Sequence, residues 1–84
     1  MQETFTVYSK DNCSFCQQAK SFLLMRSKKF EVKNLGSDYT LEEFRTKFPE
    51  QKTFPMIVHQ KYSEDGDQFN IEVGGFDRLK EYLK

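Results

Sequence analysis

The sequence has no net charge, no long apolar run and only two cysteines, and each of these shortages excludes a class of protein. Its 84 residues carry 13 Lys and Arg against 13 Asp and Glu, which excludes a strongly basic nucleic-acid binder driven by counterion release. No run of about 18 apolar residues occurs, so we expect no membrane span. Two cysteines are too few for the disulfide framework of a small secreted protein, and the first residues lack the basic and apolar regions of a signal peptide. We therefore expect a cytoplasmic protein.

The composition favours a folded chain with an aromatic core. Nine phenylalanines combined with a formal charge of zero argue against intrinsic disorder. A chain of this length buries only about two-thirds of its unfolded surface, so its core must be rich in aromatic side chains to hold. We expect one domain that spans residues 1–84, and a monomer.

The first half of the sequence begins with a strand pattern and continues with a helix pattern. Segment 4–9, in which phenylalanine and valine alternate with threonines, is typical of a half-buried strand. Apolar residues then recur every three or four positions. They predict an amphipathic helix that begins at or just before Cys13, with Lys28 and Lys29 placed to suit its C-terminal dipole.

A second strand and a second helix follow. Segment 30–35 is typical of a strand, and Thr40 with Glu43 fits a capping box at the start of a helix that Pro49 ends. Because a helix separates the first two strands, we expect these strands to be parallel.

The second half predicts an antiparallel hairpin and a last helix. Segment 56–58 is a short apolar strand, 69–73 alternates as a half-buried strand, and 60–68 between them contains a turn signal. After two glycines, segment 76–83 has helical spacing. The predicted fold is therefore α/β, in the order β-α-β-α-β-β-α of a thioredoxin-like fold, with a four-stranded mixed sheet flanked by three helices.

Cys13 and Cys16 form a Cys-x-x-Cys motif at the start of the first predicted helix. A helix N-terminus offers unpaired N–H groups and about half a positive charge, which favours the thiolate form that acts as nucleophile. We expect Cys13 to attack a disulfide and Cys16, one turn inside, to resolve the mixed disulfide. Lowering a thiol pKa from about 8.5 to about 5 needs about 5 kcal/mol, of which the helix dipole supplies at most about 2. Hydrogen bonds and the nearby Lys10 would supply the rest.

A structural zinc site is the main alternative for the cysteine pair. Tetrahedral zinc takes four N or S ligands, whereas the sequence offers two cysteines and the single histidine His59. We expect no metal site, and we interpret His59 as an ordinary residue at the end of a strand.

Two further segments could bind a ligand. Pro55 opens a strand directly after Phe54. A cis Phe54–Pro55 peptide bond would turn the Phe54 backbone toward the thiols. Because only about 5–6% of X–Pro bonds are cis, the residues alone favour a plain trans turn. Gly74-Gly75-Phe76-Asp77 permits close approach of a ligand backbone, although the segment taken alone favours a simple strand-to-helix turn capped by Asp77.

Together the three segments resemble the glutaredoxins, and the resemblance covers essentially the whole chain. Residues 8–16, 53–55 and 73–77 look like that family's active-site loop, cis-proline turn and glutathione-binding glycine segment. The stretch 74–83 looks most like the small glutaredoxins of large tailed phages. The resemblance implies glutathione as co-substrate, bound by Lys10, Phe15, Arg45, Thr53, Phe54, Pro55, Gly75, Phe76 and Asp77.

The resemblance also implies a role for each segment. Phe15 would form the aromatic wall beside the thiol, and Lys10 would approach the glycine carboxylate of glutathione. Phe54 would pair with the cysteinyl backbone, with Thr53 supporting the turn, and the start of the last helix would take the γ-glutamyl end.

Three departures from the family pattern stand out. Ser14 replaces the common proline between the cysteines, which loosens the loop and shifts the redox potential. Glu42 stands where relatives carry a glutamine or arginine toward the glutathione carboxylate, so Arg45, one turn on, is the candidate substitute. The hairpin segment 61–68 is longer than usual.

Three functions are compatible with these features. The first is a dithiol glutaredoxin that reduces protein disulfides and glutathione mixed disulfides; the phage resemblance implies ribonucleotide reductase as a client and the host cytoplasm as its location. The second is a thioredoxin-like donor recharged by a flavin thioredoxin reductase, which the Glu42 departure favours. The third is a non-enzymatic carrier of an iron–sulfur cluster shared across a dimer.

Overall fold

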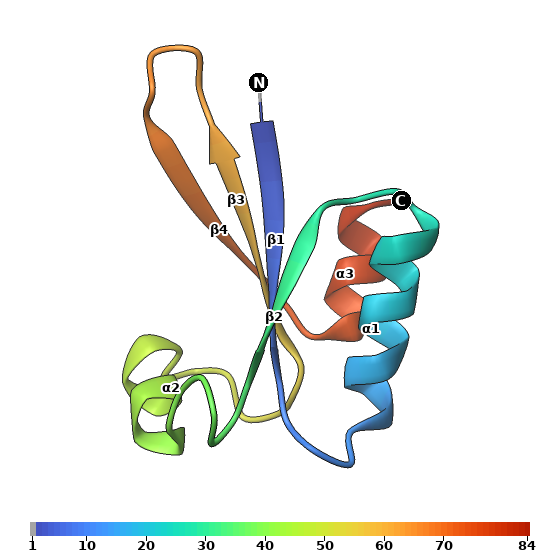
Figure 1. Ribbon diagram of the computed structural model, residues 1–84, viewed down its shortest axis with the longest axis vertical. Coiled ribbons are helices and arrows are strands. Elements are labelled where there is room, and N and C mark those ends of the chain that lie inside the picture. Colours follow the sequence, from blue (N-terminus) through green and yellow to red (C-terminus); the bar gives the residue numbers. More distant parts are fainter. Residues whose placement is uncertain (1) are drawn as a thin grey trace.

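The computed structural model describes residues 2–84 and contains one mixed sheet with three helices. The elements in chain order are β1 (Gln2–Ser9), α1 (Ser14–Met25), β2 (Phe30–Asn34), α2 (Leu41–Lys47), β3 (Met56–Tyr62), β4 (Gln68–Gly74) and α3 (Phe76–Tyr82). This order confirms the predicted β-α-β-α-β-β-α arrangement and the thioredoxin-like α/β fold (Figure 1).

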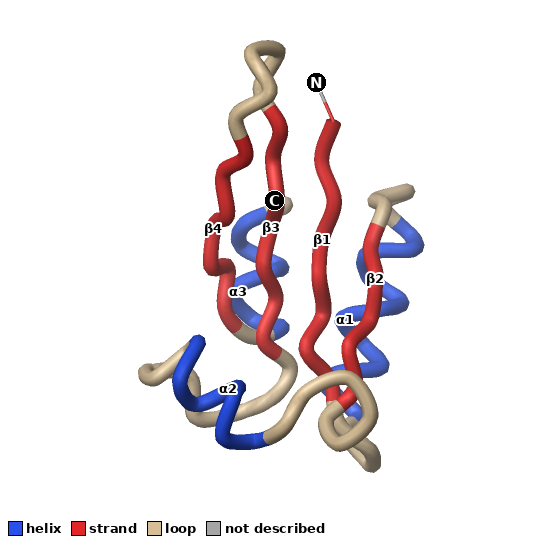
Figure 2. The backbone as a smooth tube through the Cα atoms, turned by 60° about the vertical axis from the view of Figure 1, so that its left-hand side comes forward, coloured by secondary structure: helices blue, strands red, loops and turns tan. Residues whose placement is uncertain are grey.

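The strands lie in the order β2-β1-β3-β4. β1 and β2 are parallel, as the helix between them requires, whereas β1 with β3 and β3 with β4 are antiparallel. Figure 2 shows α1 and α3 together behind the sheet and α2 on the opposite side, near the end where β1 finishes and β3 begins. Four connections therefore meet at that end of the sheet: the loops after β1 and β2, the turn before β3 and the glycines after β4.

Alternation along β1 builds two separate cores. Phe5 and Val7 face α1 and α3, where they pack in a buried cluster with Ala19, Leu23, Ile57 and Leu79. Tyr8 points to the other face and packs with Tyr39, Phe44, Phe48, Met56 and Val58 under α2. The sheet is thus covered on both faces near the end that carries the loop after β1.

The helix ends follow the local sequence signals in part. Thr40 and Glu43 form the predicted capping box, with Glu43 N–H donating to Thr40 Oγ1 and Thr40 N–H donating to Glu43 Oε1. The prediction that Lys28 and Lys29 serve the C-terminal dipole of α1 is wrong, because that helix ends at Met25 and Ser27 turns the chain with a positive φ of 57°.

The hairpin differs from its predicted boundaries. β3 continues to Tyr62 rather than stopping at residue 58, because its whole length pairs with β1. The turn is accordingly short, with Ser63 N–H donating to the Asp67 carbonyl at 2.8 Å. His59 lies in the middle of β3 and is 4% exposed, so its interpretation as a strand-end residue is also wrong.

Candidate active site

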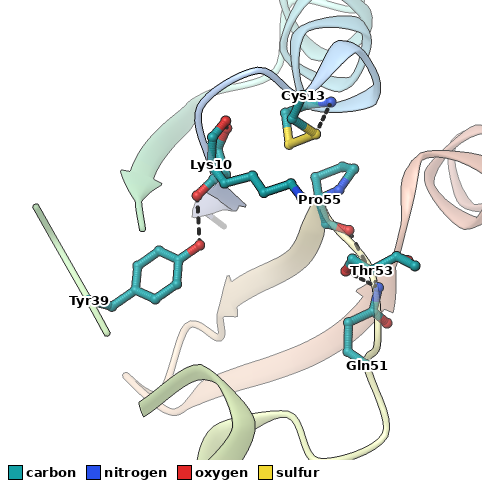
Figure 3. Close-up of a disulfide and its surroundings, with 8 residues drawn as sticks. Lys10, Cys13, Tyr39, Gln51, Thr53 and Pro55 are labelled. Atoms are coloured by element: carbon teal, nitrogen blue, oxygen red, sulfur yellow. Dashed lines mark hydrogen bonds between the residues drawn. A yellow bond between two sulfur atoms is a disulfide. The ribbon is translucent and has the colours of Figure 1, made fainter. Parts of the chain in front are cut away.

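Cys13 and Cys16 form a disulfide at the N-terminus of α1, with their Cα atoms 5.3 Å apart. Cys13 is the N-cap: its backbone is extended, and its sulfur accepts a hydrogen bond from the Cys16 N–H at 3.2 Å (Figure 3). A sulfur in this position lies at the positive end of the helix dipole. The first turn of α1 contains no acidic residue that would oppose a negative charge there.

The two sulfur-bearing residues differ in their access to solvent. Cys16 is completely buried against the core, whereas Cys13 is half-buried and precedes the exposed Ser14. Phe15, between the cysteines, is 56% exposed. Because only Cys13 combines partial exposure with the helix-capping position, it is the sulfur that an incoming disulfide can reach.

The loop that carries Cys13 is fixed where it leaves β1. The Ser9 carbonyl, at the end of that strand, accepts the Tyr39 hydroxyl at 2.7 Å and the Leu35 N–H at 2.9 Å. Burial, reinforced by the nearby Tyr8 and Asp38, raises the pKa of Tyr39 to about 12, so the hydroxyl keeps its proton at neutral pH. This buried donor holds the start of the active-site loop (Figure 3).

The turn before β3 lies opposite the disulfide. Phe54 and Pro55 are joined by a cis peptide bond, and Pro55 is buried beside Cys13 (Figure 3). The Phe54 ring is half-buried and stacks on Phe44 of α2, with ring centroids 4.6 Å apart. The Lys10 ammonium lies 5.4 Å from the centroid of the Phe54 ring.

A cavity of about 420 Å³ joins the three segments that the sequence singled out. It is lined by the predicted residues Phe15, Thr53, Phe54, Pro55, Gly75, Phe76 and Asp77 and by two residues that the sequence analysis did not select, Gln51 and Arg78. The structure thus brings together seven residues from α1, the proline turn and the start of α3.

The two glycines after β4 have different structural requirements. Gly74 has φ +112°, and a Cβ on it would meet Arg78 Cγ at 3.0 Å. A Cβ on Gly75 would lie 3.7 Å from the Pro55 carbonyl oxygen, an ordinary contact. Gly74 is therefore needed for the backbone turn itself, and Gly75 brings the start of α3 close to the proline turn.

Two predicted binding residues lie outside this cavity. Arg45 lines a separate cavity of about 300 Å³ that shares Gln51 and Phe54 with the first. Lys10 approaches from the other side of the site, over Phe54. Asp77 is 93% exposed and pairs with Lys80 at 3.6 Å, so its carboxylate reaches into solvent at the cavity edge.

Within residues 2–84, no cluster of three or more His, Cys, Asp and Glu side chains is arranged to hold a metal ion. The helices of this described region are also too short or too polar to cross a membrane.

Comparison with known proteins gives the family. The family model described as glutaredoxin matches residues 5–62. Glutaredoxin of Enterobacteria phage T4 is 30% identical over 90 residues, covering 95% of this chain and 99% of the phage protein. The crystal structure of glutaredoxin 1 from Francisella tularensis complexed with cacodylate superposes with a TM-score of 0.70 over 98% of this chain and 93% of that one, at 17% identity.

The chain belongs to the glutaredoxin family. Family membership and the Cys13–Cys16 disulfide together make it a thiol–disulfide oxidoreductase.

Proposed function

We propose that this protein is a dithiol glutaredoxin that uses glutathione to reduce protein disulfides and glutathione mixed disulfides. The observation that carries the proposal is the cavity lined by Phe15, which lies between the two cysteines, by the proline turn and by the start of α3. Its lining includes an extended backbone segment and the start of a helix, whose backbone groups can pair with those of a peptide.

The reaction follows from the asymmetry of the two cysteines. In the reduced protein, the Cys13 thiolate attacks one sulfur of a substrate disulfide, and the other substrate sulfur leaves as a thiol. Cys16 then attacks Cys13 Sγ, which releases the second substrate thiol and forms the Cys13–Cys16 disulfide. The substrate gains two electrons and two protons, and the dithiol loses them.

Glutathione reverses the oxidation in two steps. One glutathione thiolate attacks Cys13 Sγ and expels Cys16 as a thiol. A second glutathione attacks the sulfur of the bound glutathione, which releases glutathione disulfide and restores the Cys13 thiolate. Two glutathione molecules are oxidised for each protein disulfide reduced.

The binding roles are assigned by position. The backbone of Phe54 pairs with the cysteinyl residue of glutathione, Phe15 covers the sulfur, and Gly75, Phe76 and Asp77 receive the γ-glutamyl end. Lys10 and Arg45, which flank the Phe54 ring, attract the glycine carboxylate. Thr53 supports the turn.

A comparison of two electron sources tests this proposal. Reduction of a glutathione mixed disulfide is measured with glutathione and glutathione reductase, and reduction of a protein disulfide with a flavin thioredoxin reductase. We expect activity with the first system. Activity with thioredoxin reductase alone would reject glutathione as the reductant, and a brown protein with absorbance in the blue would indicate a cluster carrier instead.

The variant Cys16→Ser tests the division of labour between the cysteines. Turnover of a glutathione mixed disulfide should survive, because glutathione itself resolves the intermediate, whereas reduction of protein disulfides should fall sharply. Equal loss of both activities would contradict the assigned roles.

The proposal extends to partners and location. We propose that the whole chain acts as one domain in the reducing cytoplasm, where a dithiol can be regenerated. Ribonucleotide reductase, which needs a dithiol donor, is the proposed client.

A further inference from the structure

Gln51 lies beside the proline turn, at a position that the sequence analysis did not select. Its side chain is half-buried and lines the cavity of about 420 Å³ beside the disulfide, a second cavity of about 600 Å³ and the cavity of about 300 Å³ that contains Arg45. It therefore lies where three hollows around the turn meet.

The Gln51 amide also holds the backbone of the turn. Its Nε2 donates to the Thr53 carbonyl at 2.9 Å and approaches the Pro55 carbonyl at 3.5 Å (Figure 3). The first contact has the length of a normal hydrogen bond, and the second is long. One side chain thus contacts the carbonyl groups on both sides of Phe54.

The contact with Thr53 determines where the Phe54 N–H points. The Thr53 carbonyl and the Phe54 N–H belong to one planar peptide unit, and in a trans unit they point in opposite directions. A side chain that holds the carbonyl on one side of the chain therefore directs the N–H to the other side. In Figure 3 the labelled Gln51 lies next to Thr53, and the labelled Cys13 lies next to Pro55, at the other end of the same segment.

The Phe54 backbone is left free by this arrangement. In the described part of the chain, neither the N–H nor the carbonyl of Phe54 takes part in a hydrogen bond. An unpaired donor and acceptor in an extended segment beside a reactive sulfur can bind the backbone of an incoming peptide.

We propose that Gln51 is a positioning residue for substrate binding: its amide fixes the Thr53–Phe54 peptide unit so that the Phe54 backbone stays presented to the peptide that flanks the attacked sulfur. This role adds detail to the proposed function, and it rests on that function where the bound peptide is glutathione. It also applies to any peptide disulfide, because the recognised groups belong to the backbone.

The test replaces the amide without changing the size of the side chain. Gln51→Met keeps the length and approximate volume of the side chain but has no N–H donor, so the packing around the turn is retained while the hydrogen bond is lost. We expect KM to rise about fivefold, which corresponds to the net contribution of the one ordinary hydrogen bond that holds the turn, while kcat stays within about twofold. The rate of Cys13 alkylation should not change, because Gln51 acts on the turn and not on the sulfur.

Gln68→Met is the matched control. Gln68 is exposed on β4, and its Nε2 donates to Asn70 Oδ1 at 3.0 Å, so this variant also loses one amide hydrogen bond, but at the far end of the sheet. We expect no change in KM. If Gln51→Met does not fold, Gln51→Ala provides the same comparison with a smaller side chain.

Both variants are assayed with a glutathione mixed disulfide and with a small peptide that contains an internal disulfide. If the unmodified protein reduces only the peptide disulfide, the proposed use of glutathione is rejected. The KM for the peptide disulfide then still tests the role of Gln51. A KM within twofold of the unmodified protein on every substrate it reduces would overturn the proposal. So would a loss of thermal stability with no change in KM, which would make Gln51 purely structural.

Discussion

The hydroxyl of Tyr82 stabilises the fold through the buried ring of His59. The two groups lie 2.6 Å apart, His59 is only 4% exposed, and its ring stacks on Phe5 with centroids 4.2 Å apart. The other ring nitrogen lies 3.0 Å from a carboxylate oxygen of Glu3. Since a carboxylate only accepts, Nε2 carries a proton, and Nδ1 has the Tyr82 hydroxyl as its hydrogen-bond partner.

Tyr82→Phe should therefore leave Nδ1 unpaired in the core. A buried polar atom without a partner costs about 1–3 kcal/mol, and some access of water at Tyr82, which is 38% exposed, puts the expected loss in the lower half of this range, at about 1.5 kcal/mol. For a domain of this size, a loss of about 1.5 kcal/mol lowers Tm by about 6–12 °C.

Thermal unfolding followed by circular dichroism measures this loss, with Tyr62→Phe as the control. Tyr62 is 37% exposed, almost the same as Tyr82, but no hydrogen bond of its hydroxyl is present in the described part of the chain. The control should change Tm by less than about 3 °C, as expected for an exposed substitution away from a network. Equal shifts in the two variants would refute the reasoning. Disulfide reductase activity should not change, because Tyr82 and the cavity residue Phe76 lie at opposite ends of α3.

Three further predictions concern the turns and caps around the site. Gly74→Ala should destabilise the protein by about 1–3 kcal/mol, because φ is +112° at this residue, whereas Gly75→Ala should fold normally. The free energies of unfolding of the two variants are measured in urea. Equal values would contradict the strain argument. Thr40→Ala removes the capping-box hydroxyl and should cost about 1 kcal/mol in the same assay. Burial raises the pKa of Tyr39 to about 12 in the folded protein, against 10.0 for an ordinary tyrosine. The contribution of the protonated hydroxyl to the free energy of unfolding should therefore be complete below pH 10 and should be lost as the pH rises toward 12. Tyr39→Phe should make stability less dependent on pH in that range, which unfolding at pH 9 to 11 would show.

Local patterns predicted the elements well because each depends on neighbouring residues. The alternation of Phe5 and Val7 identifies a strand with one face in the core, and the pairing of Thr40 with Glu43 identifies a helix start. The parallel pairing of β1 and β2 follows from the helix between them.

Features that depend on contacts between distant segments could not be predicted from local sequence patterns. The length of β3, and with it the burial of His59, depends on the register with β1, which no local pattern encodes. The end of α1 depends on Ser27, a residue whose positive φ has no sequence signature.

The candidate site shows the same division. Cys13 and Cys16 carry a motif with a clear chemical meaning, so they could be selected from the sequence. Gln51 and Arg78 carry no motif and line the cavity only because the proline turn and α3 meet there.

The most direct test of the account is the reactivity of the Cys13 sulfur. In reduced Cys16→Ser protein, the rate of alkylation by iodoacetamide is measured between pH 4 and 10. The helix dipole alone, worth up to about 2 kcal/mol, should move the midpoint of this profile from about 8.5 to about 7, and the hydrogen bond from the residue 16 N–H should move it lower. A midpoint at about 8.5, as for an ordinary exposed thiol, would contradict the claim that the start of α1 holds Cys13 as a thiolate.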